Sequence, residues 1–482
     1  MMNIKKSSYL ELGSSFYSKA TISPLQGAST ILFNHKLADG LNLSELSNSE
    51  YWHPHNLPKH LEPIAMAYAG HQYGRYTPQL GDGRAAMLGE ATTKNGKSID
   101  LQLKGSGPTI FSRGGDGYAS ISAVLREYII SEAMYALGVP TTRSLAAIVS
   151  TENIIRATPE PRGLLIRAAT SHIRIGSFEY FAARKDHPSI KQLADYTINR
   201  NFPSANNSSN KYQALLELVC SKQAILVAKW MGLGFIHGIM NTDNTSISGE
   251  TLDYGPCAFM DEYKAQQVFS SIDKYGRYAY SAQPDIMLWN LTSFANCIAP
   301  LLARDSSAQE AMVIAALDGF LARFEQHYFT NMLAKIGLSD HTSENKNLII
   351  NLLKIMEENK ADFTLTFSYL AEAALGNTEQ LLSLFKNRTK IANWLTTWQH
   401  ALAQVQTKTT QDIMLQHNPI VIPRNHLIER ALQQYNKTKD ITDIEKMIVI
   451  LQQPFAALSP AHQNYTLPPE AHERVGQTFC GT

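Results

Sequence analysis

The segment MNTDNTSISGETLDYG, residues 240–255, carries side chains with clear chemical potential. Asp243 and Asn244 are adjacent, and Asp253 follows a stretch of Thr, Ser and Gly that predicts a tight hairpin. A hairpin would bring the Asn244 amide oxygen beside the Asp253 carboxylate, which suits Mg²⁺, an ion that completes its shell with phosphate and water. Asp243 could accept a proton. An ordinary polar turn would have the same composition, because Asn and Asp are common turn residues.

A lysine lies at the end of a predicted strand. From residue 98 to residue 104, apolar residues alternate with polar ones, and Lys104 is the last polar position. This alternation predicts a strand with one buried face and with Lys104 on the other face. A single strand lysine is usually a solvated charge, so any function needs a carboxylate that positions it.

The helix predicted at about 120–137 could supply that carboxylate. Ser120 can cap its start, and Gly138 can end it. On a helical wheel Glu132 lies within the apolar stripe, whereas Glu127 lies beside the stripe. The wheel alone therefore favours Glu132 as the partner of Lys104, because a buried carboxylate needs a compensating charge.

Two further groups of residues are suited to phosphate. Gly81 and Gly83, followed by Arg84, form a short glycine turn where backbone could approach a nucleotide. Arg167 and Arg174 lie seven residues apart, and guanidinium groups match phosphate oxygens. Each of these signals is weak when taken separately.

The order of these features is that of a protein kinase. A glycine turn, a strand lysine, a helix glutamate, an Asp-Asn pair and a DYG sequence follow one another along the chain. The spacing between the candidate base and the candidate metal-binding Asn differs from that of ordinary kinases, because HGIMNTDN places Asp243 directly before Asn244.

Four blocks of the sequence resemble the selenoprotein O family of protein adenylyltransferases, which have a pseudokinase fold. The blocks are YAGHQYGRYTPQLGDGRAAMLGE (68–90), LQLKGSGPTIFSRGGDG (101–117), LREYIISEAMYALGVPTTRSLA (125–146) and FIHGIMNTDNTSISGETLDYGP (235–256). Weaker similarity covers most of the chain.

The resemblance implies roles for individual residues. It implies that Asp243 is the proton acceptor, and that Asn244 and Asp253 are metal ligands. It implies Glu127, and not Glu132, as the partner of Lys104. The implied nucleotide contacts are Gly81, Gly83, Arg84, Lys104, Asp116, Gly117, Arg167, Arg174 and Asp253.

The resemblance also implies a reaction. A nucleotide bound in the reverse orientation to that of kinases would donate AMP from ATP, or UMP from UTP, to a Ser, Thr or Tyr hydroxyl of a protein and release pyrophosphate. Mg²⁺ is the implied metal, with Mn²⁺ as the other candidate. Two alternatives remain at this point: a conventional protein kinase and a catalytically silent nucleotide-binding scaffold.

Composition limits the class of protein. The 482 residues include 43 Lys and Arg and 42 Asp and Glu, a net charge of +1, which gives no bulk electrostatic case for binding nucleic acid or membrane. Four cysteines are too few for a disulfide scaffold. The start of the chain lacks the apolar stretch of a secretory signal. The longest apolar stretch, 224–240, is interrupted by Lys229 and His237. We therefore expect a cytoplasmic protein.

The expected fold class is α+β, with a two-lobed protein-kinase-like core. We expect an N-terminal extension over 1–75, an N-lobe over 76–160 and the core of a C-lobe over 161–284. Within the second lobe, 161–180 is expected to form strand and turn, and 211–232 a helix. A helical part over 285–457 and a polar, Pro-containing tail over 458–482 complete the prediction.

The tail holds Cys480, the third residue from the C-terminus. Some bacterial members of the family pair this cysteine with one in the loop after DYG, but the corresponding loop here, 263–273, contains no cysteine. Cys257, directly after DYGP, is the candidate redox partner of Cys480. A free thiol that the cytoplasm keeps reduced is the alternative.

Overall fold

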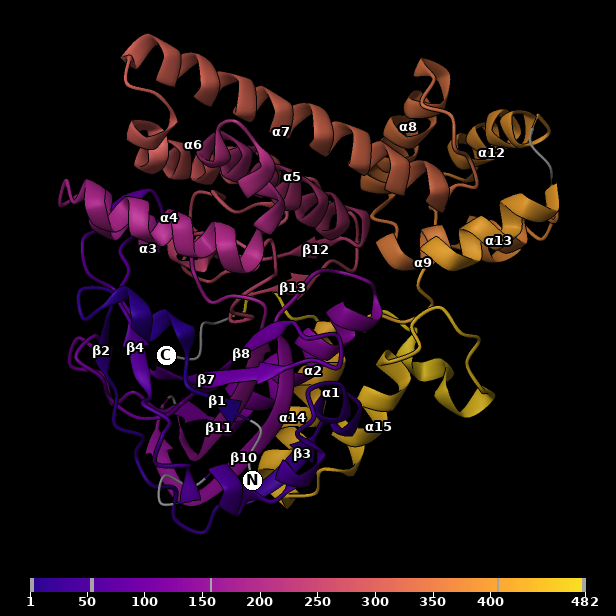
Figure 1. Cartoon of the computed structure of the whole chain (residues 1–482). Helices are drawn as coiled ribbons and strands as arrows, with labels where there is room; N and C mark the ends of the chain where they lie inside the picture. Colours follow the sequence, from indigo (N-terminus) through magenta and orange to yellow (C-terminus); the bar gives the residue numbers. More distant parts are fainter. Residues whose placement is uncertain (1–3, 53–55, 157, 405–406, 479–482) are drawn as a thin grey trace.

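The computed structural model describes residues 4–52, 56–156, 158–404 and 407–478, and its architecture is mixed α/β (Figure 1). A sheet of nine strands forms one layer. Its main path runs β2 (Tyr17–Lys19), β4 (Ile64–Met66), β7 (Ala85–Thr92), β8 (Ser98–Lys104), β11 (Pro159–Ala169), β10 (Arg143–Ile155) and β3 (Ser29–Phe33). The short strands β1 (Ile4–Lys5) and β9 (Ala119–Ser120) pair with β7 and β11. All the pairings are antiparallel, which suits a sheet connected mainly by hairpins.

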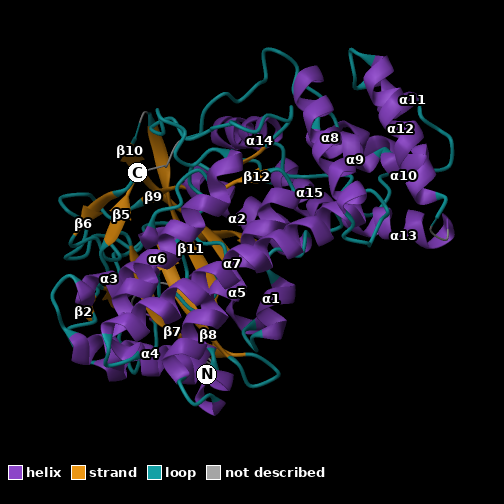
Figure 2. Cartoon of the chain, turned by 90° about the horizontal axis from the view of Figure 1, so that it is seen from above, coloured by secondary structure: helices purple, strands orange, loops and turns teal. Residues whose placement is uncertain are grey.

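Most helices form a second layer above this sheet (Figures 1 and 2). This layer contains α3 (Ile175–Ala182), α4 (His187–Asn201), α5 (Lys211–Gly232), α6 (Gln283–Leu302) and α7 (Ser306–Lys335). The outer helices are α8 (Ser343–Asn359), α9 (Phe363–Ser368), α10 (Leu370–Ala373), α11 (Glu379–Ser383), α12 (Arg388–Leu402) and α13 (Thr407–His417). The large helical region therefore begins before residue 285 and continues through most of the later chain.

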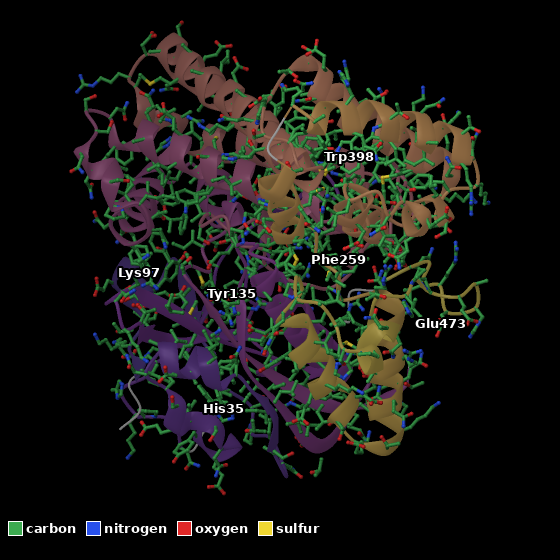
Figure 3. All side chains as sticks on the ribbon, turned by 90° about the vertical axis from the view of Figure 1, so that its right-hand side faces the viewer. His35, Lys97, Tyr135, Phe259, Trp398 and Glu473 are labelled. Atoms are coloured by element: carbon green, nitrogen blue, oxygen red, sulfur yellow. The ribbon has the colours of Figure 1, made fainter. Side chains whose placement is uncertain are left out.

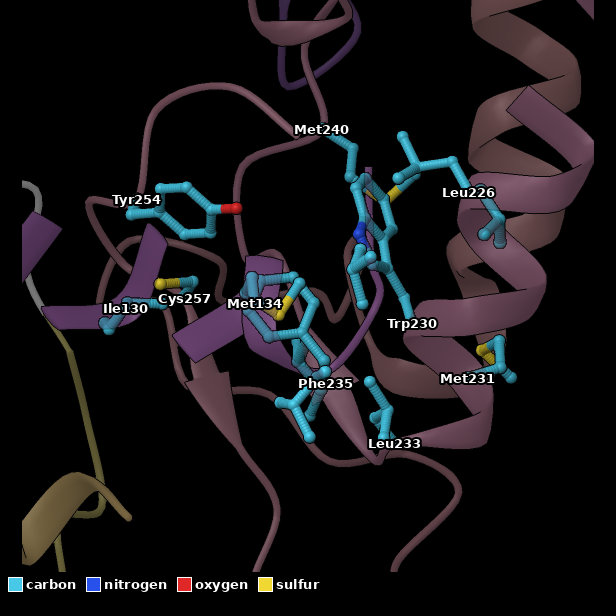
Figure 4. Close-up of a cluster of buried hydrophobic side chains, with 14 of the residues drawn as sticks. Ile130, Met134, Leu226, Trp230, Met231, Leu233, Phe235, Met240, Tyr254 and Cys257 are labelled. Carbon is cyan, nitrogen blue, oxygen red and sulfur yellow. The ribbon is translucent and has the colours of Figure 1, made fainter. Parts of the chain in front are cut away.

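Helix α2 (Ile121–Ala136) links the two layers. Ser120 caps it by accepting a hydrogen bond from Ala123 N, and Gly138 follows it at a positive φ of 75°. Its last turns join an apolar cluster in which Met134 and Ile130 lie near Trp230, Phe235 and other side chains from the start of the helical layer (Figure 4). Because α2 is buried on several sides, its glutamates can act only through partners inside the protein.

The expectation that one face of β8 is exposed was wrong. Asp100 and Gln102, on the polar face, are as buried as the leucines on the other face. Asp100 accepts from His172 N at 3.0 Å, and Gln102 donates to Asp82 at 3.3 Å. Strand β8 lies inside the sheet between β7 and β11. Its alternating polar side chains are therefore buried and form hydrogen bonds within the protein, and they do not contact water.

Two other expectations need correction. The strand and turn predicted over 161–180 ends at Ala169, and α3 follows from Ile175. The tail predicted from 458 contains a short 3-10 helix, Pro460–Tyr465, with no buried residue, and its last described residue, Thr478, is buried against the protein. Thr478 N donates to Phe269 O at 2.7 Å, and Ser271 N donates to Thr478 O at 3.2 Å.

The chain returns to the sheet layer near its end. Helices α14 (Asn425–Thr438) and α15 (Thr442–Leu451) lie beside α2, below the outer helices (Figures 1 and 3). Arg126 of α2 pairs with Glu429 of α14 at 2.9 Å, and Ser122 accepts from Asn436 at 2.9 Å. The helical region thus contributes to both layers.

The remaining elements are short. They are α1 (His35–Gly40), the β5–β6 hairpin (Gly70–Gln72 and Arg75–Thr77) and the pair β12 (Phe235–Ile236) and β13 (Ala258–Phe259). No helix in the described part of the chain is long and apolar enough to cross a bilayer.

Arg424 offers a test of how the last segment is anchored. Its guanidinium is 1% exposed and pairs with Asp261 at 2.5 Å and with Asp362 at 2.8 Å. Arg424→Met would leave both carboxylates without this cation, and we expect it to reduce the free energy of unfolding by about 3–5 kcal/mol. The exposed Arg388→Met should change it by less than about 0.5 kcal/mol. Urea denaturation followed by circular dichroism measures both, and equal effects would contradict this assignment.

Candidate functional site

One cavity of about 350 Å³ collects the residues that the sequence singled out. Its lining contains Gly81, Gly83, Arg84, Lys104, Asp116, Gly117, Arg167, Arg174, Asp243, Asn244 and Asp253. A larger cavity of about 550 Å³ adjoins it at Arg84, Lys104 and Gly255, but contains neither Asp243 nor Asn244. We therefore place the candidate chemistry in the smaller cavity.

A charge network forms the floor of this cavity. Lys104 Nζ lies 2.5 Å from Glu127 Oε2 and 2.9 Å from Asp253 Oδ1. Arg167 Nη2 repeats this pattern, at 2.5 Å from Glu127 Oε1 and 2.7 Å from Asp253 Oδ1. Each cation is thus held between one carboxylate from α2 and one from the DYG segment, and together they join the two layers.

Arg174 adds a third cation to Asp253. Its Nη2 lies 3.5 Å from Asp253 Oδ2, and its Nη1 lies 3.0 Å from Asp82 Oδ1. The guanidinium also stacks 4.3 Å from the centre of the Tyr68 ring. Arg174 is only 3% exposed, so these contacts hold it rigidly beside the cavity.

The network keeps Asp253 ionised. Burial by itself would raise the pKa of this carboxyl, but attraction from Lys104, Arg167 and Arg174 outweighs burial and holds the pKa well below its usual range. The pKa of Glu127 is lowered in the same way, by Arg167 and Lys104 against the effect of burial. The cavity therefore offers fixed cations and a charged carboxylate at neutral pH.

Asp243 has the opposite environment. It lies in a short 3-10 turn, Thr242–Asn244, and is 8% exposed. Its Oδ1 has no hydrogen-bond partner among the described residues. Burial raises the pKa of Asp243 to about 7. Asp243 lines the cavity, and a buried carboxylate there is suited to accepting a proton from a bound hydroxyl.

The predicted hairpin between Asn244 and Asp253 has the expected form. Thr245 and Thr251 form an antiparallel bridge, and Gly249 turns the chain with φ of 76°. Asp253 itself lies at φ of 65°, a left-handed backbone conformation that residues other than glycine rarely adopt. This backbone directs the Asp253 carboxylate into the network.

Asn244 and Asp253 fit a divalent cation chemically. Asn244 Nδ2 donates to Ile239 O at 3.1 Å, so its amide oxygen is the atom available to a metal. Asp253 is ionised, and both residues line the cavity. Two protein oxygens, with the remainder from phosphates and water, form a typical magnesium site. No cluster of three or more His, Cys, Asp or Glu suited to a metal occurs in the described residues.

Two glycines allow close packing at the cavity wall. At Gly81, with φ of 69°, a Cβ would lie 2.2 Å from the Phe111 ring. At Gly117, also with φ of 69°, a Cβ would lie 2.2 Å from the Gly107 backbone. Asp116, next to it, is half-exposed and pairs with Arg156 at 2.9 Å. Larger residues at these glycines would displace the loops that line the site.

The helical wheel chose the wrong glutamate. Glu132 does not contact Lys104. Its carboxylate accepts from Arg143 Nη2 at 2.6 Å and from Asn34 Nδ2 at 2.7 Å. The wheel ranks positions on one helix by burial, whereas both Glu127 and Glu132 are buried and differ only in what lies opposite them.

Sequence reasoning missed Asp82 and Gln102 as parts of the site. Asp82 is 2% exposed and accepts from Arg174, from Gln102 Nε2 and from Met66 N. Gln102 Oε1 also accepts from Arg167 Nη1 at 3.2 Å. An aspartate between two glycines was the only local signal, and the contact of Asp82 with Arg174 joins residues 92 positions apart.

The candidate redox pair is described only in part, because Cys480 lies outside the described residues. Cys257 is fully buried in the apolar cluster, near Ile130 and Tyr254 (Figure 4). Burial raises the pKa of its thiol to about 12. Cys220 and Cys297 are also buried, as core residues are expected to be.

Comparison with known proteins gives consistent matches over nearly the whole chain. The family described as "Protein adenylyltransferase SelO" matches residues 2–452. "Protein nucleotidyltransferase YdiU" of Maridesulfovibrio salexigens is 47% identical over 98% of this chain and 97% of its own length. Proteins with that name from a Bradyrhizobium species and from Agrobacterium fabrum are 47% and 44% identical, over 99% and 98% of this chain and 99% of each relative.

Matched substitutions on α2 test which glutamate serves the site. Glu127→Gln removes the charge shared by Lys104 and Arg167, and we expect it to weaken ATP binding at least about tenfold. Glu132→Gln should leave ATP affinity within about twofold but lower the free energy of unfolding by about 1–3 kcal/mol, because Arg143 loses its partner. Calorimetric titration with ATP and Mg²⁺, together with thermal unfolding, measures both. Weaker ATP binding in the Glu132 variant alone would overturn the assignment.

Proposed function

The chain belongs to the SelO family of protein adenylyltransferases, and we propose that it transfers AMP from ATP to Ser, Thr or Tyr hydroxyls of proteins. Pyrophosphate is the second product. UTP, with transfer of UMP, is the other nucleotide to be tested. The observation that carries the proposal is the convergence of eleven sequence-predicted residues on one cavity, around an ionised Asp253 that meets three cations.

The chemistry follows from the charges. A triphosphate bound in the cavity would attract Lys104, Arg167 and Arg174, which are already positioned by Glu127 and Asp82. As these cations turn toward phosphate, the Asp253 carboxylate becomes available to Mg²⁺ or Mn²⁺ together with Asn244. The metal would supply further neutralisation of phosphate charge. Positioning and charge neutralisation are the main requirements of phosphoryl-type transfer.

Asp243 would act on the acceptor. Its carboxylate takes the proton of the incoming hydroxyl, the hydroxyl oxygen forms a bond to the α-phosphorus, and the bond from that phosphorus to the bridging oxygen of pyrophosphate breaks. A carboxylate whose pKa lies near 7 is suited to this exchange, because about half of it is ionised at neutral pH and the ionised form is basic enough to accept the proton.

We also propose that the mixed α/β architecture is a kinase-like pair of lobes. The strands β7 to β10 with α2 correspond to the N-lobe, 76–160, after an extension over 1–75 that adds β1 to β4 to the same sheet. The segment 161–284 supplies the C-lobe core with the Asp243 and Asp253 loops. The helical part over 285–457 and the tail over 458–482 complete the division. Support comes from the Lys104–Glu127 pair, which joins a strand and a helix as the kinase lysine and glutamate do.

Substitution of the two aspartates tests the reaction. We expect Asp243→Asn to slow transfer by about 10²–10⁴-fold, in the range of general-base catalysis, while ATP binding is retained. Asp253→Asn should abolish metal-dependent transfer, because an amide cannot replace the charge that holds the cation. The exposed Asp39→Asn is the matched control. Intact-mass measurement after incubation with ATP and Mg²⁺ detects the product.

The mass of the product also separates the alternatives. An added AMP supports the proposal, whereas an added phosphate would identify a conventional kinase. ATP binding without modification of the enzyme or of any protein in a cell lysate would support a silent scaffold. The deprotonated Asp253 and unpaired Asp243 argue against a scaffold, which needs neither group.

A redox link between Cys480 and Cys257 remains a proposal, and we expect it to be conditional. Thr478, two residues before Cys480, donates to Pro256 O, so the tail passes beside the segment that holds Cys257. The buried Cys257 thiol reacts slowly while that segment is packed, since the thiolate is the reactive form. Peptide mapping after diamide treatment should find the linked peptide in about 2 M urea but not in buffer alone. Linkage in buffer alone, or in neither condition, would contradict this.

A further inference from the structure

The β5–β6 hairpin covers the loop that carries Asp243. His71 N donates to Thr242 Oγ1 at 2.7 Å, and Tyr73 N donates to Asn241 Oδ1 at 3.1 Å. At Gly70 a Cβ would lie 2.4 Å from Asp243 Oδ1. The hairpin therefore closes one side of the candidate base, and any acceptor hydroxyl must reach Asp243 along the cavity beside the hairpin.

The two faces of the hairpin differ. His71 is paired with Tyr76, and their rings lie 5.0 Å apart, with the Trp289 ring 5.0 Å from His71. Gln72 is paired with Arg75, and the Gln72 side chain lines the cavity that contains Asp243. Directly paired residues of antiparallel strands project to the same face, so Arg75 lies on the cavity side.

A second arginine lies at the tip of the hairpin. The turn residues Tyr73 and Gly74 both have positive φ, 52° and 81°, as a two-residue hairpin turn requires. A Cβ at Gly74 would lie 3.4 Å from Arg277 Cζ, and Arg277 stacks 4.9 Å from the centre of the Trp289 ring. Arg75 and Arg277 therefore flank the same end of the hairpin. We call them the arginine pair.

Neither arginine has a carboxylate partner within ion-pairing distance in the described residues. The nearby acidic groups are engaged elsewhere. Asp273 accepts from Arg277 N at 2.9 Å and Tyr278 N at 2.8 Å, through the backbone only. Glu179 accepts from Thr242 Oγ1 at 2.6 Å and contacts His71 Nδ1 at 2.8 Å. Asp285, one helical turn before Trp289, is exposed and pairs with neither arginine. The positive charges of Arg75 and Arg277, beside the hairpin that covers the Asp243 loop, are thus not compensated by an ion pair within the described residues.

We propose that the arginine pair selects the acceptor, a protein segment with Asp or Glu close to the hydroxyl that is modified. The inference rests on the proposed transfer to proteins and names the class of segment that this site takes. Arg75 would pair with an acidic residue beside the bound hydroxyl, and Arg277, stacked on Trp289, with a second one at the hairpin tip. Guanidinium groups held next to aromatic rings are suited to carboxylates of a docked chain. Charge at such a rim sets specificity more than total affinity.

A library of serine-centred peptides tests the proposal. Each flanking position carries Asp, Ala or Lys, and transfer is followed with ATP labelled at the α-phosphate. The wild-type enzyme should favour Asp over Lys at one or more flanking positions by about tenfold in kcat/KM. The double variant Arg75→Glu/Arg277→Glu should reverse this preference with the KM for ATP within about twofold of wild type, and Arg388→Glu, far from the site, should retain it.

The outcomes distinguish this inference from the proposed function. No charge preference in the wild type, or the same preference in the double variant, would overturn the role of the arginine pair. Labelling of the enzyme itself without labelling of any peptide would also overturn it and would leave the proposed reaction standing. Absence of label from enzyme and peptides alike would refute the proposed function itself. Reversal of the preference only in the double variant is the result that supports the inference.

Discussion

The Asp253 carboxylate is the interaction on which the rest of the site depends. It meets Lys104 from the sheet, Arg167 from the neighbouring strand β11 and Arg174 from the start of α3. Three cations around one partly buried carboxylate are stable only because Glu127 and Asp82 share two more negative charges with them. The same network that joins the two layers is therefore prepared to exchange Asp253 for phosphate. In the proposed function, structural cohesion and nucleotide binding use one set of charges.

Asp243 differs from Asp253 in its surroundings and therefore in its charge state. Asp243 lies ten residues before Asp253 and forms no ion pair among the described residues, and burial beneath Gly70 raises its pKa toward neutrality. Two aspartates of one loop thus acquire different chemistry from their surroundings, one as a fixed anion and one as a base. The β5–β6 hairpin creates this difference and also limits the approach to the base. An element that precedes the rest of the site in the chain thereby influences both proton transfer and the choice of acceptor.

Local sequence predicted the parts whose cause is local. The Ser120 cap, the Gly138 end of α2, the 211–232 helix and the turn between Asn244 and Asp253 follow from residues only a few positions apart. Local sequence patterns gave wrong predictions where a residue is buried by a strand or helix distant in the sequence. The polar alternation of β8 indicated an exposed face, but β8 lies within the sheet, and Asp100 and Gln102 are satisfied by hydrogen bonds to distant residues. The helical wheel failed for the same reason, because it does not show what lies opposite each glutamate.

The sequence by itself determined which residue types could do the chemistry, and the family resemblance gave their order and proposed roles. Only the tertiary structure decided which charges meet. Lys104 and Asp253 are 149 positions apart, and the contacts of Arg174 with Asp82 and of Gly70 with Asp243 span similarly long stretches of chain. Periodicity and turn signals extend over a few residues, whereas the pKa of a carboxyl depends on every charge and every buried surface within a few ångströms of it. The different states of Asp243 and Asp253 are therefore a property of the folded chain.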